Sequence, residues 1–163
     1  MIYIVEGSNK VGKTTGIEQI LKRDDSRKKI TINNRYVNDM MEDRRHDSAI
    51  SAYSMLDFIK ELSIVEDLDV YIDRFHLSEL VYGKLNRKYT NHSMYTIDEH
   101  LSKINNLKLV LITCNDYSHV EDKMKVSEYL EVQTNMKFAF NESMIKNKVI
   151  VTSDKFVKGE VPW

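Results

Sequence analysis

Gly7-Ser8-Asn9-Lys10-Val11-Gly12-Lys13-Thr14, near the start of the chain, match the pattern G-x-x-x-x-G-K-[ST] at every fixed position. Glycines in such a pattern let the backbone curl so that successive N–H groups point at phosphate oxygens. The segment follows an apolar run at residues 2–6 and precedes a stretch with helical periodicity at residues 13–21. We therefore predict a phosphate-binding loop between a buried strand and a helix.

Two side chains of this loop have a clear chemical task. The helix that begins at Lys13 adds the positive end of its dipole to the phosphate site. The Lys13 ammonium can reach the β- and γ-phosphates of ATP, and the Thr14 hydroxyl can bind Mg²⁺. The predicted nucleotide-binding residues are Gly7, Ser8, Asn9, Lys10, Val11, Gly12, Lys13, Thr14 and Thr15.

Beyond the loop, apolar runs alternate with stretches of helical periodicity. Further strands are expected at residues 29–32, 70–72, 107–113 and 148–151, and helices from 47 to about 62, at 77–83, 96–104 and about 120–145. Thr96 and Glu99 have the spacing of a capping box for the third of these helices. Strands that alternate with helices favour a parallel sheet covered on both faces. The predicted fold is a three-layer α/β/α P-loop fold with about five parallel strands, in one domain over residues 1–163.

Asp73 and Arg74 follow the strand expected at residues 70–72. A P-loop nucleotidase needs a carboxylate near its metal ion, usually at the end of a neighbouring strand, and Asp73 suits that role. A guanidinium can hold a phosphate through two parallel hydrogen bonds, which suits Arg74. The alternative is a surface Asp-Arg pair after an edge strand. Beside a phosphate-binding loop we favour the functional interpretation.

Two segments resemble the thymidylate kinase family, within the wider group of nucleoside and nucleotide kinases. Residues 5–15, VEGSNKVGKTT, resemble F-E-G-x-D-x-x-G-K-[ST]-T, and residues 73–82, DRFHLSELVY, resemble D-R-[YFH]-x-x-S-x-x-A-Y. The resemblance implies that ATP and Mg²⁺ are the cofactors and that a deoxynucleoside monophosphate accepts the phosphate, with dTMP the first guess. It also implies a lid at about residues 115–135.

The resemblance further implies roles for individual residues. Asp73 would lie at the metal ion and the acceptor phosphate, and Arg74 would clamp the acceptor. Lys10 stands where some thymidylate kinases have a catalytic Arg, and Arg35 stands where the family often has an acceptor-phosphate Arg; either residue would equally suit an exposed surface. The implied catalytic residues are Lys10, Lys13, Asp73 and Arg74. The implied acceptor-binding residues are Glu6, Asn9, Arg35, Arg74 and Tyr82, and the implied metal ligands are Thr14 and Asp73.

Several positions depart from the family pattern. Asn9 replaces the usual Asp, and Gly83 replaces the Gln that usually follows Tyr82. The Phe-x-x-x-Arg pair expected to recognise thymine is absent, and residues 115–135 contain no Arg. These departures concern the acceptor base rather than the kinase class.

Three other functions remain as alternatives. In a deoxynucleoside kinase, Glu6 would resemble the base that takes a proton from the sugar hydroxyl. That family usually has Glu before the Arg, so Asp73 favours a monophosphate acceptor. A P-loop regulatory protein would need an exposed partner surface, which no long basic or apolar tail supplies. A nucleic-acid kinase should have a basic groove, and the formal net charge of −1 does not favour one.

Composition describes an ordinary globular chain. Its 163 residues are 42% hydrophobic and 30% charged. The single cysteine, Cys114, cannot form an internal disulfide, and no run of eighteen apolar residues indicates a membrane span. We expect a cytoplasmic protein without a membrane partner, whose partner is a small nucleotide or nucleoside; a homodimer is left open.

Overall fold

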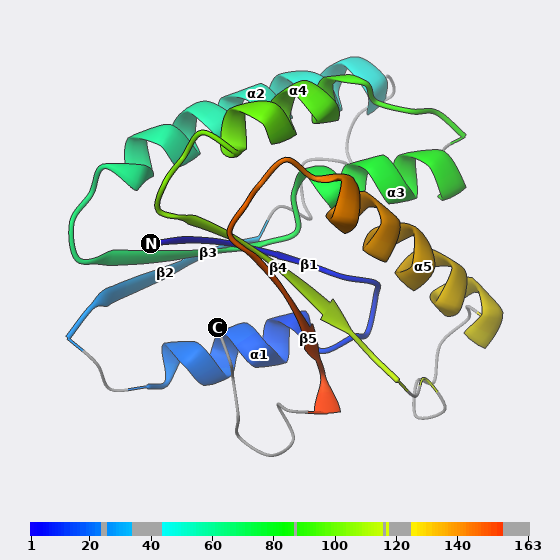
Figure 1. The fold of residues 1–163 in the computed structure, drawn as a ribbon, viewed down its shortest axis with the longest axis horizontal. Helices are drawn as coiled ribbons and strands as arrows, with labels where there is room; N and C mark the ends of the chain where they lie inside the picture. Colours follow the sequence, from blue (N-terminus) through cyan, green and yellow to red (C-terminus); the bar gives the residue numbers. More distant parts are fainter. Residues whose placement is uncertain (24–25, 34–43, 87, 116, 118–124, 155–163) are drawn as a thin grey trace.

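The computed structural model describes the chain except for residues 24–25, 34–43, 87, 116, 118–124 and 155–163. Strands and helices alternate along the described residues (Figure 1). Their bounds are β1 (Ile2–Glu6), α1 (Lys13–Leu21), β2 (Lys28–Asn33), α2 (Arg44–Ser63), β3 (Leu68–Asp73), α3 (His76–Asn86), α4 (Ser93–Leu101), β4 (Leu107–Thr113), α5 (Val126–Glu142) and β5 (Lys148–Thr152).

The strands form one five-stranded sheet in the order β2-β3-β1-β4-β5, with every neighbouring pair parallel. The strand before the phosphate-binding loop, β1, is central, and its Ile4 is in register with Ile72 of β3 and Leu109 of β4. Central strands of a parallel sheet are covered on both faces, which explains why β1 and β4 are apolar almost throughout. The arrangement confirms the predicted α/β/α fold with five parallel strands.

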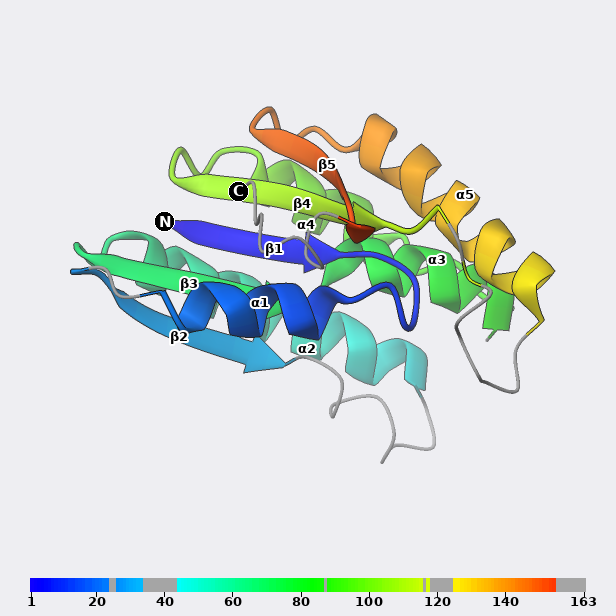
Figure 2. The ribbon, with the colours of Figure 1, turned by 90° about the horizontal axis from the view of Figure 1, so that it is seen from below.

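The helices cover the sheet unequally. In Figure 2, α1 lies on one face, and α2, α3, α4 and α5 lie on the other. Side chains of a strand alternate between the two faces, so Ile4 belongs to one core cluster and Val5 to another. The second cluster also contains Ile17 of α1 and Tyr129 of α5.

Parallel strands bring their carboxyl ends to the same edge of the sheet. The loop after β1, Asp73 at the end of β3 and Cys114 after β4 therefore meet there. This edge is where the predicted site residues are expected to gather.

Two expectations about helices need correction. Helix α4 begins at Ser93, so Thr96 lies inside it, and Glu99 forms an ion pair with Lys103 at 2.8 Å rather than closing a capping box. Residues 126–135 of the expected lid form the first part of α5, where Tyr129 and Val132 are buried. Of the remaining lid segment, residues 116 and 118–124 lie outside the described residues. Among the described helices, none is long and apolar enough to cross a membrane.

Candidate active site

The loop between β1 and α1 has the backbone that its glycines predict. Gly7 has φ 149° and Gly12 has φ 89°, values that residues with a side chain rarely adopt. A Cβ atom on Gly7 would lie 2.5 Å from the Ile112 carbonyl oxygen of β4. Gly7 is thus required both by its dihedral angle and by the close approach of two strands, and the loop is tied to the sheet at its first residue.

Lys13 lies inside this loop rather than above it. The residue is 3% exposed, and its Nζ donates to the carbonyl oxygens of Gly7 at 3.2 Å and Ser8 at 2.6 Å. The ammonium is therefore held at the mouth of the loop, the place where phosphate oxygens bind in P-loop proteins.

Thr14 and Asp73 meet as the sequence predicts for two ligands of one metal ion. The Thr14 hydroxyl donates to Asp73 Oδ2 at 3.0 Å, although 59 residues separate them. Asp73 is 2% exposed, and its Oδ1 is buried without a hydrogen-bond partner. A buried acceptor of this kind is normally satisfied by a group absent from the protein, and a hydrated metal ion fits it.

The donor set fits Mg²⁺ bound together with nucleotide. Magnesium in such sites takes one or two protein oxygens and fills its remaining positions with phosphate oxygens and water. The described residues contain no group of three or more His, Cys, Asp or Glu side chains placed to hold a metal ion. Thr14 and Asp73 would therefore hold the ion only in partnership with a bound phosphate.

Arg74 is a buried cation with neutral partners. The residue is 9% exposed; its guanidinium donates to Asn9 Oδ1 and lies 5.3 Å from the centroid of the Tyr82 ring. Its Nε is buried without a hydrogen-bond partner, and no carboxylate of the described residues forms an ion pair with it. Because a buried charge without a counter-ion is costly, this arrangement is typical of an anion-binding site.

Asn9 and Tyr82 link the two sequence motifs around Arg74. The Asn9 N–H donates to the Tyr82 hydroxyl at 3.0 Å, and Asn9 Oδ1 accepts from Arg74. The structure thus brings Asn9, Arg74 and Tyr82 together beside the loop. Lys10, at φ 58°, and Thr15 are exposed in and after the loop. Arg35 lies outside the described residues.

Glu6 has a role that the sequence did not indicate. The residue is fully buried; its Oε1 accepts from the N–H groups of Phe75 at 2.9 Å and Leu77 at 3.1 Å, and its Oε2 accepts from the Ser78 hydroxyl. These donors belong to the start of α3, where backbone N–H groups lack helical partners. The carboxylate therefore joins β1 to α3 and fixes the segment that carries Asp73 and Arg74.

Tyr117 is a contact of the loop that sequence analysis missed. Its hydroxyl lies 2.6 Å from the Ser8 hydroxyl, and it is 2% exposed. Burial raises the pKa of Tyr117 more than the hydrogen bond with Ser8 lowers it, so the phenol is protonated at neutral pH. No motif near residue 117 indicates this contact.

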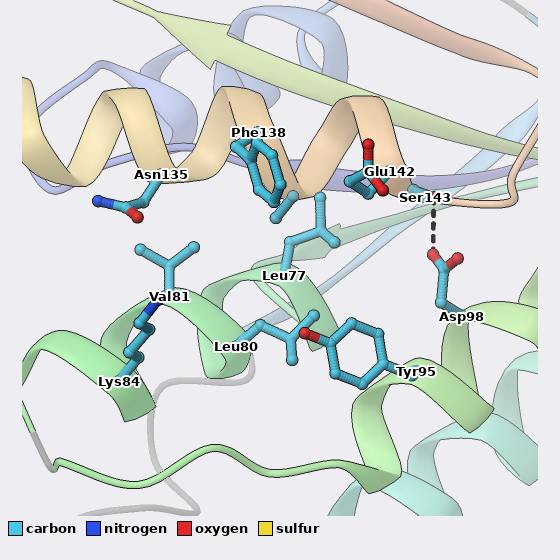
Figure 3. A pocket seen from close by; sticks show the side chains of 11 residues that line it. Leu77, Leu80, Val81, Lys84, Tyr95, Asp98, Asn135, Phe138, Glu142 and Ser143 are labelled. Carbon is cyan, nitrogen blue, oxygen red and sulfur yellow. Dashed lines mark hydrogen bonds between the residues drawn. The ribbon is translucent and has the colours of Figure 1, made fainter.

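A groove on the helical face lies apart from the predicted site residues. It is lined by side chains of α3, α4 and α5 and by Ser143, and it contains none of the residues predicted to bind nucleotide or acceptor (Figure 3). At one end, Asp98 accepts a hydrogen bond from the Ser143 hydroxyl at 2.6 Å.

Comparison with known proteins finds similarity in structure. No protein-family model matches the chain, and no curated protein matches it in sequence. The YorR protein of Bacillus subtilis, described in complex with phosphorylated GDP, superposes with a TM-score of 0.59 at 16% identity, over 97% of this chain and 92% of that chain. Thymidylate kinase from Candida albicans superposes with a TM-score of 0.60 at 11% identity, over 96% of this chain and 87% of that chain.

The chain has a thymidylate kinase-like fold. At these identities the similarity establishes the fold alone, so the activity is argued from the site itself.

Proposed function

We propose that this protein transfers the γ-phosphate of ATP, in the presence of Mg²⁺, to the phosphate of a deoxynucleoside monophosphate, with dTMP the first acceptor to test. The observation that carries the proposal is the Arg74 guanidinium, buried with neutral partners beside the Thr14–Asp73 pair. One anion site lies in the loop and a second lies next to it, as a reaction between two phosphorylated substrates requires.

Each residue of the site contributes position or charge. The loop N–H groups and Lys13 bind the phosphates of ATP, and Thr14 and Asp73 hold Mg²⁺, which neutralises charge on the β- and γ-phosphates when bound. Arg74, oriented by Asn9 and Tyr82, holds the acceptor phosphate in line with the donor. Lys10 neutralises charge on the transferred group. Water must be excluded during transfer, and closure over residues 115–125 would do this.

The contacts of Glu6 favour a monophosphate over a nucleoside acceptor. A sugar hydroxyl needs a base to take its proton, whereas a phosphate acceptor is already anionic and needs none. The Glu6 carboxylate accepts hydrogen bonds from Phe75, Leu77 and Ser78, which engages both of its oxygens in the structure. The deoxynucleoside kinase is therefore the second candidate.

The test is a coupled ADP-release assay with ATP and Mg²⁺ against a panel of deoxynucleoside monophosphates, nucleosides and short oligonucleotides. The panel includes dGMP, because the YorR structure is described with phosphorylated GDP bound. Lys13→Ala is the control, and it should abolish turnover. Turnover with one monophosphate would identify the acceptor, and turnover with nucleosides alone would promote the second candidate. ATP binding without turnover across the panel would contradict the kinase proposal and favour a regulatory ATP-binding protein.

A further inference from the structure

A chain of buried hydrogen bonds connects the phosphate-binding loop to α5. Ser8 and Tyr117 meet through their hydroxyls at 2.6 Å, and Tyr117 donates to Gln133 Oε1 at 2.9 Å. Gln133 in turn bonds to both backbone groups of Cys114: Oε1 accepts from the N–H at 2.7 Å, and Nε2 donates to the carbonyl at 3.0 Å. None of the four residues is more than 8% exposed.

The direction of each hydrogen bond follows from its partners. Only the oxygen of an amide can accept from the Cys114 N–H, and only its NH₂ group can donate to the Cys114 carbonyl, so the orientation of Gln133 is determined. Gln133 Oε1 then accepts the single proton of the Tyr117 hydroxyl. The oxygen of Tyr117 is left to accept from Ser8, whose proton therefore points away from the phosphates.

The far end of this chain is anchored in the core. The Tyr117 ring stacks on Tyr129 of α5, with ring centroids 5.1 Å apart and an angle of 14° between the planes. Both rings belong to the core cluster that also contains Val5 of β1 and Ile17 of α1. A close-packed cluster of this kind does not readily shift, so the Tyr117 hydroxyl has a defined position.

The near end of the chain sets the position of Lys13. Ser8 is held by its hydroxyl on one side, and on the other its carbonyl accepts from Lys13 Nζ at 2.6 Å. The peptide that carries both groups is thereby oriented. Gly7 precedes Ser8 and Lys10 follows two residues later, both with positive φ, so this part of the loop depends on outside contacts to keep its shape.

We propose that Tyr117 is a positioning residue of the nucleotide-binding loop. By accepting the Ser8 proton, Tyr117 holds the loop in the conformation that receives phosphates before the nucleotide arrives. Preorganisation of this kind raises affinity because binding no longer has to order the loop. The inference rests on the proposed function in one respect, since it requires the loop to bind nucleotide.

The experiment is an equilibrium titration of the full-length protein with a fluorescent ATP analogue and Mg²⁺, without acceptor. Tyr117→Phe leaves the buried Ser8 hydroxyl without its acceptor, and we expect affinity to fall about tenfold. Ser8→Ala removes the same bond from the other side, and the double variant should bind no more weakly than Tyr117→Phe alone. Tyr129→Phe is the matched control, because it changes a neighbouring buried tyrosine that does not contact the loop; it should keep the wild-type affinity.

The outcomes separate the inference from the proposed function. If the wild type binds the analogue and Tyr117→Phe binds it equally well, the inference is wrong and the proposed function stands. Additive losses in Ser8→Ala and Tyr117→Phe would also contradict the inference, because they would show that the two side chains act independently. If Tyr117→Phe does not fold, unchanged affinity in Ser8→Ala decides against the inference. A wild type that binds no nucleotide overturns both.

Discussion

Arg74 and Asp73 are adjacent residues whose buried polar atoms are not all satisfied by the described protein. Arg74 Nε and Asp73 Oδ1 both lack hydrogen-bond partners. Native structures leave few such groups, and those that remain usually mark a binding site. Two adjacent residues with this property, one cationic and one acidic, indicate a site built for an anion and a metal ion.

Replacement of Arg74 should separate stability from function. In Arg74→Met an apolar side chain of similar length replaces a buried cation without a counter-ion, so the free energy of unfolding should stay unchanged or rise by about 1 kcal/mol. Turnover should fall by about 100-fold, because the acceptor phosphate loses its cation. Urea unfolding and the ADP-release assay measure the two effects. A loss of stability above about 2 kcal/mol would show that Arg74 supports the fold instead.

Replacement of Asp73 should act on magnesium. Asp73→Asn can keep the hydrogen bond from Thr14 but loses the negative charge, so the Mg²⁺ concentration for half-maximal turnover should rise about 10- to 100-fold. Asp69→Asn is a matched control on the same strand, since Asp69 pairs with Arg27 and the N-terminal amine at the other end of β3. The control should lower stability and leave the Mg²⁺ requirement unchanged. Equal Mg²⁺ titrations for Asp73→Asn and the wild type would remove Asp73 from the metal site.

Helix α3 is held to the sheet by a carboxylate from another element. Glu6 at the end of β1 accepts two backbone N–H groups and one hydroxyl from the start of α3. A negative charge at this end also interacts favourably with the helix dipole. The placement of Asp73 and Arg74, which lie between β3 and α3, therefore depends on β1 as well as on their own strand.

Glu6→Gln tests this connection. The amide removes the charge and turns an NH₂ group toward at least one donor, so the free energy of unfolding should fall by about 1–3 kcal/mol. Ser78→Ala, which removes one of the same hydrogen bonds, should lose less. Urea unfolding provides the measurement. If Glu6 is instead the base of a nucleoside kinase, Glu6→Gln will keep wild-type stability and lose nucleoside phosphorylation.

Asp98 joins three helical elements at one buried carboxylate. It bonds to His76 of α3 at 2.8 Å, and it accepts from the Ser143 hydroxyl and the Met144 N–H after α5, both at 2.6 Å. Burial raises the pKa of Asp98, but the hydrogen bonds from His76, Ser143 and Met144 and the charge of His76 outweigh it, so the pKa is lowered overall. Asp98 therefore stabilises the fold at pH values above the ordinary Asp range.

The contribution of Asp98 should disappear on acidification. Because its folded pKa lies below its unfolded value, stabilisation is lost as pH falls through the folded pKa. The difference in unfolding free energy between wild type and Asp98→Asn should be largest near about pH 6 and shrink below about pH 4. Urea unfolding at a series of pH values measures this difference. A difference that stays constant down to about pH 2 would contradict the lowered pKa.

The molecule as a whole should be stabilised by nucleotide. A ligand that binds only the folded state adds about 2.7 kcal/mol at a hundred times its Kd, which raises Tm by roughly 5–10 °C for a chain of this length. Differential scanning fluorimetry with and without ATP and Mg²⁺ measures the shift. Lys13→Ala should remove it. An equal shift in wild type and Lys13→Ala would place nucleotide binding outside the loop.

Much of the fold could be predicted because its signals are local. The bounds of β1, α1 and β4 match the predicted ones, since an apolar run, a glycine loop and a helical repeat each lie within a few residues. The pairing of Thr14 with Asp73 also followed from topology, because parallel strands end at one edge of the sheet. The N-terminus of α4 was placed wrongly, because Thr96 and Glu99 fit a capping box in sequence although the helix begins before them.

What the chain alone determines is therefore the order of its elements and the loop that they present. The partners of Glu6, Arg74 and Ser8 were decided only by the tertiary structure, because they lie 65 to 109 residues away along the chain or more. A carboxylate, a guanidinium or a hydroxyl carries no local sign of which distant donor or acceptor it will meet. Burial makes these meetings matter, because a polar group removed from water must find its partner within the fold.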